Sequence, residues 1–177
     1  MSHMKVNEDF RNRSMRQLLF LLSIVLSLSI FINGCDPDRV FEENKEIPEY
    51  NWKMNDPVQF KVLVKDTVSS HAVYVNIRNF SDYPYSNIYL FIHVISPTGA
   101  ELTDTVNFLL ADKRGKWLGR GLGDLYFLQL PYKQHIRFPY SGVYTFVIKQ
   151  GMRTDLKGIR DVGLRVEREK TYTGGKK

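Results

Sequence analysis

The chain has 177 residues and one cysteine, and 43% of its residues are hydrophobic, among them 11 phenylalanines and 10 tyrosines. A single cysteine excludes an internal disulfide framework and any multi-cysteine metal site, so the fold depends on its apolar core. The formal net charge of +6 lies mostly in residues 1–34 and 165–177. Because the charge lies at the two ends of the chain and the sequence has no basic helix or nucleic-acid-binding motif, we do not expect nucleic-acid binding.

An uncharged apolar run, LLFLLSIVLSLSIFI, occupies residues 18–32 and follows a basic segment. As a helix it would span about 22 Å, which is short of the roughly 30 Å hydrocarbon core of a bilayer. A basic region, a short apolar region and a small residue at the cleavage point are typical of a secretory signal peptide. We therefore predict that residues 1–34 are a signal peptide. The alternative is an uncleaved anchor helix. Translation could start at Met1, Met4 or Met15.

The residues after this run, Ile32-Asn33-Gly34-Cys35, resemble a bacterial lipobox. Ile32 and Gly34 fit that pattern, whereas Asn33 stands where Ala, Ser or Thr is commoner. The resemblance implies that the thiol of Cys35 receives a diacylglyceryl group and that the signal is cut just before it. Two or more acyl chains make a lasting membrane anchor. We expect Cys35 to be the first residue of a tethered protein.

Residues 36–57 are polar and contain prolines, and they show neither a strand nor a helix periodicity. We predict that residues 35–57 are the lipidated N-terminus and a spacer. From residue 58 onward apolar and polar residues alternate, as in VQFKVLVK (58–65), which predicts a half-buried strand. DTVSS (66–70) then turns the chain into HAVYVNIRN (71–79), which favours a hairpin.

NIYLFIHVIS (87–96) is apolar on both faces, which is typical of a central strand. Shorter strands follow, and no stretch of residues 58–168 offers a convincing amphipathic helix. About eight strands with regular turn signals predict an all-β fold, an antiparallel β-sandwich of jelly-roll or immunoglobulin-like type over residues 58–168. Residues 169–177 are expected to be a flexible basic tail.

Motifs for chemistry are weak in this chain. GRGLGD (119–124) lacks the preceding strand and following helix of a phosphate-binding loop, so it indicates a tight turn. The four histidines lie too far apart in sequence to form a local metal motif. No serine stands in a G-x-S-x-G setting, and no element carries an evident pair of carboxylates. The sequence gives no argument for an enzyme, a metal or a cofactor other than the lipid on Cys35.

The loop GKWLGRGLG (115–123) is the best surface candidate, because it combines glycines and basic residues around Trp117. An aromatic side chain flanked by arginines, here Arg114 and Arg120, has the composition of a protein-contact hot spot. The alternative is that Trp117 folds back as a plug on the core. Two interpretations are likewise open for Tyr83 and Tyr85. They bind a partner or a sugar, or they close one end of the sandwich.

Several motifs in chain order, behind the lipobox, resemble the gliding-motility lipoprotein GldH family of the Bacteroidetes. The matching segments are YPYSNIYLF (83–91), PTG (97–99), DT (104–105), GKWLGRG (115–121), FPYSGVYTFVIKQGMR (138–153) and LKGIRDVGLR (156–165).

The resemblance implies a cell-envelope lipoprotein that serves gliding and the associated type IX secretion machinery. It implies no catalytic residues, an acylated Cys35, and motility or secretion envelope proteins as partners. The acidic residues after Cys35, interrupted by Pro37, match a surface-export signal poorly, so we expect the periplasmic face of the outer membrane. The rival hypothesis is a carbohydrate- or peptidoglycan-binding sandwich that uses Trp117 and exposed tyrosines.

Overall fold

The computed structural model describes residues 15–17, 19–20, 22 and 36–170. Cys35 and most of the predicted signal peptide lie outside the described residues, so both stay predictions. Within the described part, no helix has the length and apolar character needed to cross a membrane. The elements are β1 (Arg39–Glu46), η2 (Pro48–Tyr50), β2 (Asn51–Trp52), β3 (Val58–Val64), β4 (His71–Phe80), β5 (Asn87–Ile95), β6 (Glu101–Leu109), β7 (Arg120–Leu122), β8 (Leu125–Ile136), β9 (Gly142–Gln150), β10 (Leu156–Lys157) and β11 (Ile159–Arg168).

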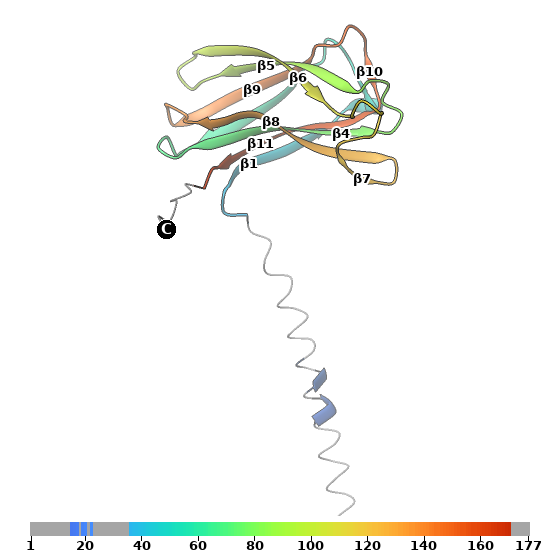
Figure 1. Cartoon of the computed structure of the whole chain (residues 1–177). Helices are drawn as coiled ribbons and strands as arrows, with labels where there is room; N and C mark the ends of the chain where they lie inside the picture. The colour runs from blue at the N-terminus through green and yellow to red at the C-terminus, as the bar shows by residue number, and fades with distance from the viewer. Residues whose placement is uncertain (1–14, 18, 21, 23–35, 171–177) are drawn as a thin grey trace, which may run out of the picture. The chain divides into compact units, whose positions relative to one another are not determined.

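Two antiparallel sheets make up the domain (Figure 1), in the strand orders β1-β11-β4-β8-β7 and β3-β9-β5-β6, and β2 pairs with β10 in a small third sheet. Among the eight long strands, only β5 and β6 are consecutive neighbours in one sheet, and every other connection crosses to the opposite sheet. This order is that of a jelly roll. The all-β sandwich is therefore confirmed, and of its two predicted types the strand order is the jelly roll.

The core lies between the two sheets and follows the period-two pattern of the strands. In β3 the side chains of Phe60, Val62 and Val64 are buried while the residues between them are exposed. Every buried apolar residue of the described chain lies between Ile47 and Val166, and the described residues from Asp38 onward belong to one compact unit. The domain thus carries a complete core of its own.

The predicted spacer is corrected by β1. Arg39–Glu46 pairs with β11 along its whole length, and Trp52, only 1% exposed, lies in the core with its indole N–H donating to the carbonyl oxygen of Asp56 at 2.7 Å. The sandwich therefore begins at Arg39 and not at residue 58. The sequence pattern hid β1 because it is an edge strand whose exposed side chains are mostly charged, a common protection of sheet edges.

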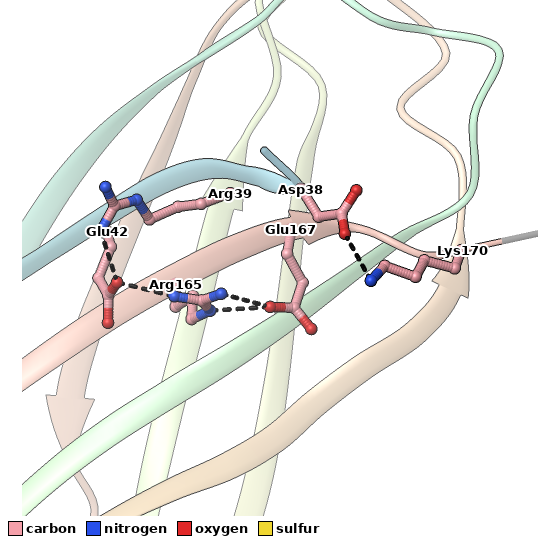
Figure 2. Close-up of polar contacts among 6 residues, drawn as sticks. All are labelled: Asp38, Arg39, Glu42, Arg165, Glu167 and Lys170. Atoms are coloured by element: carbon pink, nitrogen blue, oxygen red, sulfur yellow. Dashed lines mark hydrogen bonds and ion pairs between the residues drawn. The ribbon is translucent and has the colours of Figure 1, made fainter. Parts of the chain in front are cut away.

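The start of the predicted flexible tail is also corrected. The backbone N–H of Glu169 donates to the carbonyl oxygen of Ser70 at 2.8 Å, and its carboxylate accepts from the Ser70 hydroxyl at 2.7 Å. Lys170 forms an ion pair with Asp38 at 3.3 Å (Figure 2). Residues 169 and 170 therefore belong to the sandwich, while residues 171–177 lie outside the described residues.

The predicted hairpin between β3 and β4 is wrong. β3 pairs with β9 in one sheet, whereas β4 pairs with β11 and β8 in the other. Residues 66–70 therefore connect the two sheets. The prediction that β5 is a central strand is confirmed, because β5 pairs with both β6 and β9. Its second apolar face is not buried, since Tyr89 and Phe91 are 43% and 41% exposed.

A charged network on the outer face of the first sheet ties β1 to β11 (Figure 2). Arg165 donates to Glu42 and to Glu167, each at 2.8 Å, and Arg39 lies 3.4 Å from Glu42. Exposed ion pairs contribute little singly, but a shared bidentate arginine restrains several side chains at once. The network therefore fixes the position of the edge strand next to β11.

Gly163 in β11 is required by the close approach of β1. A Cβ at this position would collide with the side-chain amide of Asn44 and lie 2.9 Å from the carbonyl oxygen of Glu43. We expect Gly163→Ala to lower the free energy of unfolding by about 1–3 kcal/mol, as overpacking does, measured by chemical denaturation. Adding Asn44→Ala should recover part of the loss. Equal stabilities of Gly163→Ala and the native protein would contradict this account of the β1–β11 contact.

Candidate functional site

The jelly roll has two distinct ends. At one end, called here the tether end, β1 begins at Arg39 and β11 finishes at Arg168. At the opposite, distal end β4 finishes and β7 and β10 lie (Figure 1). β4 runs from one end to the other, and its ten residues span about 33 Å at the usual rise per residue.

The sequence-predicted aromatic residues come together at the distal end. The ring of Tyr83 lies 5.7 Å from that of Tyr85 and 6.3 Å from that of Trp117, measured between centroids. Trp117 also packs on Tyr126 at 5.7 Å. Tyr83 is only 3% exposed, and its hydroxyl donates to the carbonyl oxygen of Asn87 at 3.1 Å. These four rings form a continuous aromatic cluster.

The burial of these rings distinguishes between the two interpretations left open by the sequence, a binding surface and a plug on the core. Tyr83 closes the end of the sandwich, because it is buried and burial raises the pKa of its hydroxyl. Trp117 is half-buried against the core, so it is mainly a plug. Tyr85, at 37% exposure, is the tyrosine of the pair that solvent reaches. A glycan platform needs open aromatic faces, which a buried Tyr83 does not offer.

The basic residues of the loop lie on the outside of this cluster. The side chain of Asp112 accepts hydrogen bonds from the backbone N–H groups of Arg114 and Lys116 at 2.8 and 2.9 Å. Ala111 and Trp117 form an isolated antiparallel β-bridge. This turn, residues 112–115, is closed by Gly115 with a positive φ of 79°. Arg114 and Arg120 are both exposed. The aromatic plug and the Asp112 turn thus hold the arginines on a fixed scaffold.

A shallow groove of about 330 Å³ runs beside Arg120, and we call it the distal groove. Its walls come from the loop before β7 and from β8. Gly119 is essential there, since a Cβ would lie 2.6 Å from the carbonyl oxygen of Phe127. The lining residues are Leu118, Gly119, Arg120, Phe127, Leu128 and Gln129.

Sequence reasoning missed the β8 side of this groove. Phe127 and Tyr126 are in a strand whose apolar residues follow one another in LYFLQL, so no single residue stood out. The turn predicted at GRGLGD is only its last two residues, Gly123 and Asp124, which connect β7 to β8, whereas Arg120–Leu122 forms the short strand β7. In the part of the chain that the structure describes, no three metal-ligating side chains lie close enough together to hold a metal ion.

Comparisons with known proteins agree over most of the chain. A family model described as GldH lipoprotein matches residues 39–166. A Christiangramia forsetii protein named gliding motility lipoprotein GldH homolog is 34% identical over 157 residues, which cover 84% of this chain and 96% of the relative. The Flavobacterium johnsoniae protein named gliding motility lipoprotein GldH is 32% identical over 154 residues, covering 82% and 95%.

Two matching solved structures resemble this chain only weakly. Chains of infectious bursal disease virus, strains Gt and Gx, cover 77% and 78% of this chain at 13% and 14% identity. This chain spans 31% and 37% of their length, and the TM-scores are 0.27 and 0.26. Likeness at this level carries no argument about fold or function.

Proposed function

Because this chain belongs to the GldH lipoprotein family, we propose that it is a non-enzymatic lipoprotein of the gliding-motility apparatus and its associated type IX secretion machinery. The family model spans the sandwich from β1 to β11, and both curated relatives are named for gliding motility and are matched over almost their full length. The chain then works through contacts with other envelope proteins.

The anchor in this proposal is a lipid on Cys35. The support is the lipobox at residues 32–35 behind an apolar run and a sandwich that starts only four residues later, at Arg39. Four residues of extended chain reach at most about 14 Å, so the tether end stays near the membrane. Pro37 interrupts the acidic residues after Cys35, so this segment matches a surface-export signal poorly. We therefore assign the protein to the outer membrane, facing the periplasm.

The contact surface in this proposal is the distal end. The observation that carries it is the position of Arg120 in the lining of the distal groove, with Arg114 exposed on the loop before β7, at the end of the sandwich away from the tether. A rigid aromatic base lowers the entropy lost when these side chains bind. Arg120, in a groove that also offers Leu118, Phe127 and Leu128, suits a partner surface that places a carboxylate beside an apolar side chain.

Charge reversal at the distal end is the test. We expect Arg120→Glu to weaken binding of the envelope partner about 30-fold, which corresponds to the roughly 2 kcal/mol of a hot-spot residue. The partner is captured by crosslinking and pull-down from membranes, and colony spreading and secretion of type IX cargo are scored in the same strains. Lys61→Glu is the matched control, because Lys61 is exposed on β3, away from the groove.

Two results would count against this function. If crosslinking of the native protein recovers no motility or secretion component, contacts with that apparatus are excluded as its role. If Lys61→Glu reduces spreading as much as Arg120→Glu, the effect comes from net charge and not from the distal end.

A further inference from the structure

A second pocket, of about 450 Å³, opens at the tether end. It lies where β1 of one sheet passes β3 of the other, and two aliphatic side chains of these strands line it. The opposite seam of the sandwich, between β6 and β8, is closed by Asp104, which accepts from the Tyr132 hydroxyl at 2.6 Å and pairs with Lys133 at 3.0 Å. Farther along the β1–β3 seam, Lys45 donates to the carbonyl oxygen of Gln59 at 2.6 Å, so the pocket is confined to the tether end of this seam.

Cationic side chains from three strand ends converge on this tether-end pocket. Arg39, Lys65 and Arg168 line it against one carboxylate, Asp66. That carboxylate is engaged in its own turn, since it accepts from the backbone N–H groups of Val68 and Ser69, both at 2.9 Å. Hydrogen bonds from the Ser69 side chain and backbone hold the pKa of Asp66 at about 2. The lining of the pocket therefore has three basic side chains and one ionised carboxylate, and one of the three, Arg39, also lies 3.4 Å from Glu42.

His71 stands in the wall of the same pocket. It is fully buried, with its ring edge-on to Phe138 at 5.2 Å. Neither of its ring nitrogens has a hydrogen-bond partner among the described residues. A buried polar group without a partner is unfavourable and calls for a ligand or an ordered water. A protonated ring nitrogen is a donor that suits an anionic oxygen.

The loops around the pocket carry exposed apolar side chains. Val68, between β3 and β4, is 78% exposed, and Tyr140, between β8 and β9, is 51% exposed. Aromatic side chains are favoured where a membrane meets water, and basic residues are attracted to anionic lipids. Apolar tips beside a basic pocket therefore match a lipid surface better than they match free solvent.

We propose that the tether-end pocket binds the phosphate group of an anionic phospholipid headgroup, so that this end of the sandwich rests on the membrane. The choice of a lipid source rests on the proposed acylation of Cys35, four residues before Arg39. Arg39, Lys65 and Arg168 supply the charge, and His71 supplies the buried donor. Held in this way, the domain presents its distal end away from the membrane in a fixed orientation.

The test uses the acylated full-length mature protein with Val68→Cys. Cys35 is the only cysteine of the chain, so once it is acylated the introduced thiol is the single site for an environment-sensitive fluorophore. The labelled protein is reconstituted in vesicles of phosphatidylcholine, with or without phosphatidylglycerol. We expect a blue-shifted emission and quenching by brominated acyl chains with phosphatidylglycerol present, and partial reversal by inorganic phosphate.

The double variant Lys65→Gln and Arg168→Gln should lose this shift, while Lys61→Gln, at an exposed lysine of β3, the strand that ends just before Lys65, should keep it. Circular dichroism of each variant checks that the sandwich is folded. The same emission with and without phosphatidylglycerol, or a shift that survives in the double variant, would overturn the proposal. A full shift with inorganic phosphate in phosphatidylcholine alone would make the ligand a free phosphate and overturn the headgroup assignment.

Failure of the anchor is seen separately. A protein without acyl chains would not float with either kind of vesicle and would carry two reactive thiols. That outcome removes the proposed acylation together with the headgroup assignment. If the protein floats with the vesicles but its emission is the same with and without phosphatidylglycerol, only the pocket proposal is contradicted.

Discussion

Replacing Cys35 with serine is expected to abolish membrane attachment, moving nearly all of the protein from the membrane to the soluble fraction. A serine hydroxyl does not take up the diacylglyceryl group that a lipobox thiol receives. Each buried CH₂ contributes about 0.8 kcal/mol, so two or more acyl chains make an anchor that folding of the domain alone cannot replace. Fractionation is measured after a high-salt wash, because salt screens the attraction between basic residues and anionic lipids.

Asn33→Ala is the matched control for this experiment. It changes the lipobox at the residue that departs from the common pattern and leaves the thiol in place, so the protein should remain in washed membranes. Mass spectrometry of the native protein should show a chain that starts at an acylated Cys35. Retention of residues 18–32, or Cys35→Ser protein in washed membranes, would contradict the lipoprotein assignment.

Replacing Phe60 with alanine is expected to lower the free energy of unfolding by about 3–5 kcal/mol. Phe60 is fully buried on the inner face of β3, and its ring lies 6.4 Å from that of Phe41 on β1, between centroids. Truncation therefore leaves a cavity where the two sheets meet. For a domain of this size the midpoint of thermal unfolding should fall by roughly 10–20 °C. Calorimetry and chemical denaturation measure both quantities.

Leu63→Ala on the same strand is the control. Leu63 points to the outer face and is 53% exposed, so its truncation should change stability by no more than about 0.5 kcal/mol. Similar losses for Phe60→Ala and Leu63→Ala would mean that the inner and outer faces of β3 are assigned incorrectly.

The period-two pattern predicted most of the strands because most of them bury one face. β3 and β9 alternate cleanly between buried and exposed residues, so their inner faces are readable in the sequence. β1 was missed for a physical reason. It has one partner strand only, its register is shifted between Arg39 and Phe41, and charged residues occupy most of its exposed positions.

Connections between strands were harder to predict than the strands themselves. The turn at Asp66 has the composition of a hairpin turn, yet it joins strands of different sheets. A turn sequence determines how the chain reverses but not which strand it pairs with afterwards. Pairing depends on contacts between residues far apart in the sequence, such as Val62 of β3 with Tyr144 of β9.

The candidate site was half predictable. Trp117, Arg114 and Arg120 stood out because glycines and basic residues surround a single tryptophan. Whether Trp117 is exposed could not be read from that pattern, since its neighbours Tyr83 and Tyr126 come from other segments. The distal groove could not be predicted from the sequence either, because its lining residues come from two separate segments, 118–120 and 127–129.

The sequence by itself determined the class of fold and the family, and it predicts the lipobox, because all three depend on local order: alternation along strands, and motifs of adjacent residues. Tertiary structure alone decided which strands share a sheet, that Arg39–Glu46 completes the sandwich, and that the start of β1 and the distal groove lie at opposite ends of it. The same holds for the pocket where Arg39, Lys65 and His71 meet. These features come from packing between segments distant in the chain, and no local pattern encodes such packing.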